Sequence, residues 1–312
     1  MEMIIDIILK AGRSAVELSL FVLLPVMVVM LCLMRLLEAR GILDALVGRL
    51  TPALKPFGLN GMGVFAALQI NFVSFAAPIA TLSMMEQRGT SDRHLAATLA
   101  MIFAMAQANA AFPMMTMGLH LGTTLAFSLL GGLAAAAATY HIFGRHLSAV
   151  EENVDESLQH PSAAGAKGVL DTINLAGAEA FRIAIGAIPM LVLSLVVVGA
   201  LKRLGVIDLL TQWLTPLLAL AAIEPALILP SLTKYLAGGT AMMGVMDEMR
   251  RGDQISVELL NASAGFLINP FDLPGVAFLI SAGRRVGAVW KPAALGGCVG
   301  IVLRTAGHAF SG

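Results

Sequence analysis

The chain has 312 residues and a formal net charge of zero, and 58% of its residues are hydrophobic while 13% are charged. Soluble globular domains carry about 25% charged residues, so this composition excludes that class and indicates an all-α integral membrane protein. The balanced charge indicates no nucleic-acid partner. The two cysteines, Cys32 and Cys298, lie inside apolar runs, which excludes a disulfide framework or a cysteine metal site.

The N-terminal segment "MEMIIDIILKAGRS", residues 1–14, mixes charged and apolar residues. Two acidic residues precede its first basic residue, so it lacks the basic start of a signal peptide. We expect a short amphipathic helix at the membrane interface. Residues 15–36 follow as a plain apolar span, long enough to cross a hydrocarbon core of about 30 Å.

The segments "GILDALVGRLTP" (41–52) and "GVIDLLTQWLTP" (205–216) align without gaps and share Gly, Asp, Leu, Thr and Pro at the same places. Internal repeats in an apolar chain are typical of transporters. We therefore predict repeat 1 over 15–146 and repeat 2 over 177–312. The acidic, polar segment 147–176 between them is predicted to be a flexible linker.

Each repeat is expected to continue with the same elements. The matched segments, 41–55 and 205–222, have apolar residues at helical spacing but are short and mixed, so they are predicted to lie on the membrane surface. The next segments, 60–86 and 224–246, carry polar residues in their middle. We favour a re-entrant hairpin with those residues at a protected tip over a single crossing helix.

A long span broken in its middle comes next in each repeat. The first, 90–120, is interrupted at Gln107, Asn109 and Pro113, and the second, 255–283, at "NPFDLP" (269–274). Plain spans, 122–143 and 286–307, close the repeats, and their glycines favour close helix packing.

An odd number of full crossings in each repeat makes the two repeats inverted with respect to each other. Basic residues favour the cytoplasmic face. More of them are placed on the linker side than on the face that holds both termini, to which Arg304 is assigned. We therefore expect a multi-pass protein of the cytoplasmic (inner) membrane, with a cytoplasmic linker and both termini outside.

The segments "PSLTKYLAGGTAMMG" (230–244), "NPFDLP" (269–274) and the two "LTP" ends resemble the nucleoside recognition, or gate-domain, family of membrane proteins. That family is related to the spore-maturation-type proteins and to the transport core of the concentrative nucleoside transporters. The resemblance covers about residues 15–310. It implies a shared membrane module and does not by itself imply a nucleoside ligand.

Half-helix ends at the breaks offer free amides and carbonyls to a solute and to ions. We expect the substrate site where both hairpin tips meet both broken spans. The candidate residues are Gln69, Asn71, Ser74, Gln107, Asn109, Ser231, Thr233, Lys234, Thr240, Asn261, Asn269 and Asp272.

Several of these residues have a structural alternative. Asp272 is placed to cap the helix that restarts at Leu273, either instead of binding or as well. Lys234 either pairs with Asp272 or extends its ammonium group to the interface. Asn261, with Ser263, is placed equally well to join helices. No pair of histidines has metal-ligand spacing on a buried helix, so we predict interfacial histidines and no metal site.

The predicted function is a secondary, elevator-like transporter of a small polar solute, coupled to H⁺ or Na⁺ and with no other cofactor. If Asp272 is paired with Lys234, Na⁺ is favoured as the coupling ion, and if Asp272 is unpaired, H⁺ is favoured. Of the two, the sequence favours H⁺, because acidic residues inside membranes commonly serve proton relays. The alternatives are a non-transporting module that acts with a partner protein, and a passive channel. No nucleophile and base are arranged for catalysis, so an enzyme is not expected. We expect a homo-oligomer in a lipid bilayer.

Overall fold

The computed structural model describes residues 2–150, 168–206, 209, 212–213 and 224–311, and all regular secondary structure in these ranges is helical. Within them, long apolar helices suited to crossing a membrane cover Ile4–Ala39, Asp92–Met117, Leu121–Phe143, Val169–Leu201 and Trp290–Ser311. Their length and composition define a multi-pass membrane protein.

The chain starts with one long helix, made of α1 (Glu2–Glu17), a π-helical turn at Leu18–Leu23 and α2 (Leu24–Ala39). The turn stands next to Pro25, which has no amide hydrogen to donate to the regular ladder. Residues 1–14 were predicted to form a separate helix, but they continue into the following span without a break. Near the start of this helix, Asp6 forms an ion pair with Arg203 of a second long helix, at 3.0 Å.

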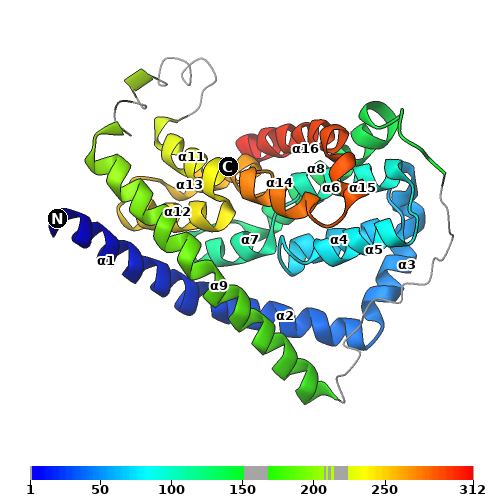
Figure 1. Ribbon diagram of the computed structural model, residues 1–312, viewed down its shortest axis with the longest axis horizontal. Helices are drawn as coiled ribbons and strands as arrows, with labels where there is room; N and C mark the ends of the chain where they lie inside the picture. The colour runs from blue at the N-terminus through cyan, green and yellow to red at the C-terminus, as the bar shows by residue number, and fades with distance from the viewer. Residues whose placement is uncertain (1, 151–167, 207–208, 210–211, 214–223, 312) are drawn as a thin grey trace.

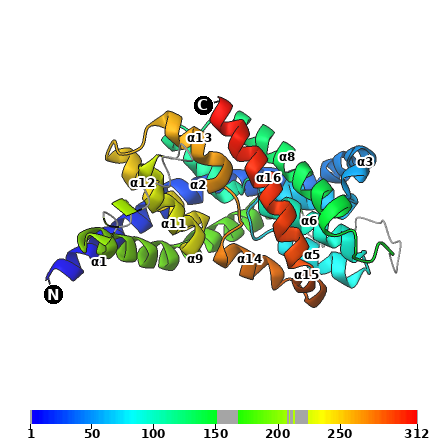
Figure 2. The same cartoon turned by 90° about the horizontal axis from the view of Figure 1, so that it is seen from above.

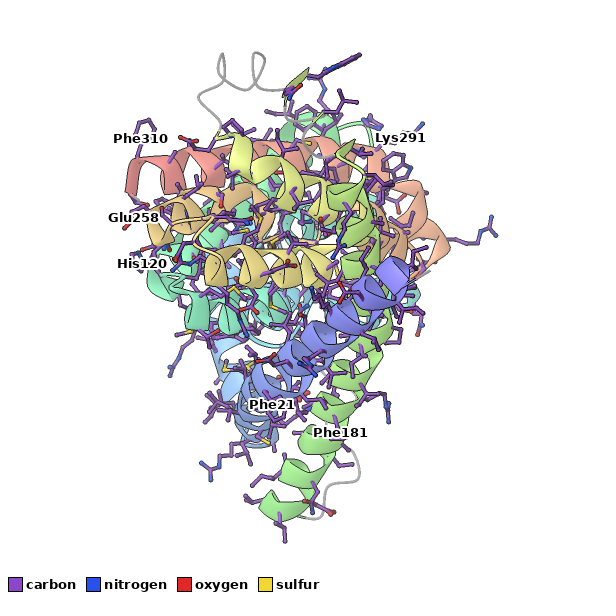
Figure 3. The ribbon with its side chains drawn as sticks, turned by 90° about the vertical axis from the view of Figure 1, so that its left-hand side faces the viewer. Phe21, His120, Phe181, Glu258, Lys291 and Phe310 are labelled. Atoms are coloured by element: carbon purple, nitrogen blue, oxygen red, sulfur yellow. The ribbon has the colours of Figure 1, made fainter. Side chains whose placement is uncertain are left out.

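That second helix, α9 (Val169–Arg203), packs along α1 and α2. It starts at Val169, inside the range 147–176 that was predicted to be linker; residues 151–167 of that linker lie outside the described residues. The two long helices cross each other on one side of the molecule, and the shorter helices lie on the other side (Figure 1). Phe21 and Phe181 project outward from them (Figure 3), and their side chains are 74% and 55% exposed.

The predicted amphipathic helix at 41–55 is present as α3 (Ile42–Leu54), followed by a 3-10 turn at Lys55–Phe57. Its buried residues, Leu43 and Val47, are one helical turn apart, whereas Asp44 and Arg49 are exposed. The matching segment, 205–222, lies mostly outside the described residues, so the second amphipathic helix stays a prediction.

Each segment predicted to be a hairpin consists of two short helices. In segment 60–86 they are α4 (Gly61–Phe72) and α5 (Pro78–Gln87), separated by residues 73–77, and Thr81 of α5 donates a hydrogen bond to Gln69 of α4 at 2.7 Å. In segment 224–246, a 3-10 turn at Pro225–Leu227 leads into α11 (Ile228–Ala237), which meets α12 (Gly239–Arg251) at Gly238.

Both long polar spans are broken in the structure. α6 (Asp92–Ala104) ends before an extended stretch at residues 105–107, and the chain continues as α7 (Ala108–Met114) and a 3-10 turn at Met115–Met117. Gln107 lies at this break as predicted, whereas Asn109 and Pro113, which were also predicted to be part of it, lie inside α7. α13 (Val257–Leu267) and α14 (Leu273–Ile280) are separated by residues 268–272.

The remaining helices enclose α6, whose apolar stretch is completely buried. They are α8 (Leu121–Ala138), its π-helical extension Thr139–Phe143, the short α15 (Arg284–Ala288) and α16 (Trp290–Ser311). α16 packs along both α8 and α6 (Figure 2). A Cβ atom at Gly300 would lie 2.3 Å from the carbonyl oxygen of Gly131, so only glycine permits this approach.

The short helices have their outer ends at two opposite edges of the molecule. His120, Glu258 and Phe310 lie at one edge, and Lys291 lies at the other (Figure 3). The Lys291 edge is held together by Arg285, which pairs with Asp92 at 2.7 Å, and by Glu86, which accepts a hydrogen bond from the backbone amide of Arg285 at 3.1 Å. The breaks lie between these edges, in the interior.

Candidate functional site

The four irregular segments line one cavity of about 300 Å³. The turn after α4, the start of α7, the junction of α11 with α12 and the break before α14 each contribute to its wall. The long helices close the opposite side with Leu23, Ile183, Gly186 and Ala187. A cavity of this volume is at the small end of the range for ligand pockets, about 300–1,000 Å³.

The predicted site residues divide into two groups. One group lines the cavity: Ser74, Gln107, Asn109, Thr240 and Asp272. The other group is absent from its wall: Gln69, Asn71, Ser231, Thr233, Lys234, Asn261 and Asn269.

Lys234 and Asp272 form a buried ion pair. The ammonium group of Lys234 donates a hydrogen bond to Oδ2 of Asp272, and both side chains are removed from solvent. Lys234 is 0% exposed, so the alternative in which it extends to the interface is wrong. Its position in the last turn of α11 also places its charge at the negative end of that helix.

Asp272 also caps α14. Its Oδ1 accepts a hydrogen bond from the amide of Gly275 at 2.7 Å, and Pro274 occupies the first turn of the helix. A carboxylate at this position satisfies a free amide and opposes the positive helix end. One side chain therefore takes both the capping and the pairing role.

The junction of α11 with α12 requires glycine. Gly238 has a φ of 93°, which other residues rarely adopt. A Cβ atom at Gly239 would lie 1.8 Å from Nε2 of Gln107. Gln107 is 2% exposed, and its Nε2 has no hydrogen-bond partner in the part of the chain that the structure describes.

Two asparagines tie the first break to its neighbours. Oδ1 of Asn109 accepts a hydrogen bond from the amide of Phe75, in the turn after α4, at 3.2 Å. Oδ1 of Asn71 accepts one from Ser128 of α8 at 2.6 Å, and Ser128 in turn accepts one from the amide of Ala106 at 2.7 Å. An amide freed by the break is thus satisfied by a side chain from a third helix.

The other predicted residues have local partners. Thr233 donates to the carbonyl of Leu229 at 2.9 Å, and Asn269 donates to the carbonyl of Phe266 at 2.9 Å. Asn261 donates to the carbonyl of Gly118 at 3.0 Å and joins α13 to the loop before α8, as its structural alternative required. Ser231 lies half-buried on α11.

Arg304 is a residue that sequence reasoning missed. It was assigned to the membrane face that holds the termini, but its side chain is completely buried in α16. Its guanidinium group donates to the carbonyl of Ala104, at the end of α6, at 2.5 Å and to that of Ile268, after α13, at 3.1 Å. It therefore satisfies the carbonyl ends of both broken spans. The available signal was that this arginine lies inside the predicted span 286–307 and not beyond its end.

The fold and the cavity together define a multi-pass membrane protein whose interior helices are interrupted around a central pocket. No known protein family and no curated protein matches the sequence. The fold is that of solved structures of the concentrative nucleoside transporter CNTnw.

Two structures of CNTnw illustrate the likeness. A double variant in an outward-facing state superposes with a TM-score of 0.70 at 17% sequence identity, over 94% of this chain and 76% of that one. An inward-facing, substrate-bound state gives a TM-score of 0.70 at 17% identity, over 99% of this chain and 84% of that one. The expected resemblance to the nucleoside transporter core is thus confirmed for the fold.

Proposed function

We propose that the protein is a secondary transporter that moves a small polar solute across the membrane, with the central cavity as its solute site. The observation that carries this proposal is the cavity itself, which is lined by four irregular segments and by the two long helices in the interior of a multi-pass membrane fold. Interrupted helices expose backbone groups at membrane depth, where they are tolerated only if they line a cavity or are buried in protein.

The proposed mechanism is alternating access by an elevator-like movement. The unit that moves would contain the paired short helices and the broken spans, and the scaffold would contain the long helices. The composition of the cavity wall supports this division, since Ile183 and Ala187 come from α9 while Gln107 and Asp272 come from the broken spans. Sliding of one unit against the other would open the cavity to each side in turn.

The ion pair bears on the coupling ion. The two oxygens of the Asp272 carboxylate accept hydrogen bonds from the ammonium group of Lys234 and from a helix amide, so neither oxygen is placed to bind a transported proton. The pair therefore favours Na⁺ over H⁺, in contrast to the preference drawn from the sequence. We retain the inverted repeats, the cytoplasmic linker, the inner-membrane location and a homo-oligomeric state as parts of the proposal.

Uptake into proteoliposomes tests the proposal. The purified protein would be reconstituted and supplied with radiolabelled uridine, as the nucleoside probe, and with labelled amino acids and organic acids, under an imposed Na⁺ or H⁺ gradient. A transporter gives saturable uptake of one of these solutes that collapses when the gradient is dissipated. Uptake that ignores the gradient would support a channel instead, and absence of any uptake together with a co-purified protein would support a partner-dependent module.

A further inference from the structure

The charged side chains buried near the breaks do not balance. Lys234 and Asp272 neutralise each other. Arg304 is bonded to backbone carbonyls, and no ion pair links it to an acidic group within the described ranges. Buried charges inside a membrane are costly and tend to be compensated. The described interior around the breaks therefore carries a formal charge of +1 that a bound anion would balance.

The helix ends at the cavity add to this positive character. α12 starts on its wall at Gly239 and has 13 residues, yet no side chain among the described residues caps its first amides. α14 also starts there, but Asp272 already caps it. α11 ends there with its negative end, which Lys234 offsets. The uncapped start of α12 thus remains as a positive helix end without a partner.

Two polar side chains, those of Gln107 and Thr240, stand beside that helix start. The amide nitrogen of Gln107 is buried against Gly239 and lacks a hydrogen-bond partner in the described part of the chain. Thr240, the second residue of α12, lies on the cavity wall with its side chain half-buried. A buried donor without an acceptor costs about 1–3 kcal/mol. A ligand oxygen at this position would remove that cost.

The rest of the wall is mostly apolar. Leu23 and Ile183 face it from the long helices, and Pro274 faces it from α14. Such a wall favours a solute with a compact apolar body and a single polar end.

From these observations we infer that the solute is a small carboxylic acid in its anionic form. Its carboxylate lies at the start of α12 beside Gln107 and Thr240, and its apolar body lies against Leu23, Ile183 and Pro274. This inference rests on the proposed function, whose solute it narrows from any small polar molecule to an organic anion.

Matched pairs of acids and amides test the charge directly. Thermal unfolding of the purified wild-type protein would be titrated, at constant ionic strength, with propanoate, 3-methylbutanoate, 4-methylpentanoate and benzoate, with the amide of each acid, and with uridine. Ligands stabilise by mass action, so the shifts yield apparent dissociation constants. We expect at least one acid to bind about tenfold or more tightly than its amide and than uridine, since its charge meets the helix end.

A pair of variants locates the effect. Gln107→Glu places a negative charge of the same shape at the proposed carboxylate position, and Gln87→Glu makes the identical change at an exposed position on α5. The preference for acid over amide should be lost in Gln107→Glu and kept in Gln87→Glu. The wild-type titration requires no variant, so it decides the matter even if Gln107→Glu fails to fold.

Three results would overturn the inference: amides or uridine that bind as tightly as the acids, no stabilisation by any acid, or a folded Gln107→Glu protein that keeps the acid preference. Uptake experiments separate this failure from failure of the proposed function. Saturable uridine uptake without acid binding rejects the anion and keeps the transporter. Acid binding without acid uptake into proteoliposomes keeps the anion and rejects the transporter.

Discussion

The ion pair between Lys234 and Asp272 should behave as one energetic unit. Lys234→Met removes the charge and keeps the apolar stem, and Asp272→Asn removes the charge and keeps a good helix cap for α14. Each single change leaves the other charge buried without a partner. Breaking a buried pair in this way costs about 3–5 kcal/mol, because the remaining ion is uncompensated.

The double variant should recover part of that loss, since it buries no charge at this position. If each single change costs about 4 kcal/mol, the double variant should cost well under their sum, with a coupling energy of about 2 kcal/mol or more. The free energies of unfolding would be compared by SDS titration of the purified proteins. A double variant whose loss equals the sum of the two single losses would refute the pairing as an energetic unit.

Further predictions concern other parts of the structure. Arg304→Met should destabilise the protein by about 3 kcal/mol or more, since it leaves the carbonyls of two helix ends without donors. The control Lys291→Met, at an exposed position, should be nearly neutral. Equal effects of the two changes in a thermal melt would contradict the role assigned to Arg304. Gly239→Ala should abolish solute binding by displacing the Gln107 amide, while an alanine at Gly122, which has open space around it, should bind as wild type does. In a protein without its native cysteines, an impermeant thiol reagent should label Arg49→Cys and Gln212→Cys from opposite sides of the membrane; labelling from the same side would reject the inverted repeats.

The breaks could be predicted from the sequence because their signal is local. Prolines, glycines and amide side chains inside an apolar run disfavour a continuous helix, and the segments around 105–107 and 268–272 are interrupted as this rule requires. The break before α14 carries the clearest pattern, since Asp272 and Pro274 are residues that typically start a helix.

The errors arose where a distant partner decides the outcome. Residues 1–14 were predicted to form a separate helix, but they continue into the next span and pack along α9, which lies far away in the sequence. Arg304 was assigned to a membrane face because no local residue explains a buried guanidinium group. Its acceptors are helix ends in α6 and after α13, and they become neighbours only when the fold is complete.

Amide side chains expose a second limit of sequence reasoning. Gln107 and Asn261 look alike in sequence, as polar residues within broken spans. The structure gives Asn261 two backbone partners at the loop before α8 and leaves Nε2 of Gln107 without a partner beside the cavity. Whether an amide is available to a ligand therefore depends on which backbone groups reach it, and the sequence does not encode that locally.

The most direct test of the account is to fill the cavity and measure transport. Ala187 of α9 lies on the cavity wall, and Leu193 lies on the same helix with 64% of its surface exposed. Counterflow of a labelled solute into proteoliposomes would be compared for wild type, Ala187→Trp and Leu193→Trp, after all three proteins are shown to be folded. The account predicts that Ala187→Trp abolishes uptake while Leu193→Trp retains it. Uptake by a folded Ala187→Trp protein at the wild-type rate would contradict the assignment of this cavity as the solute site.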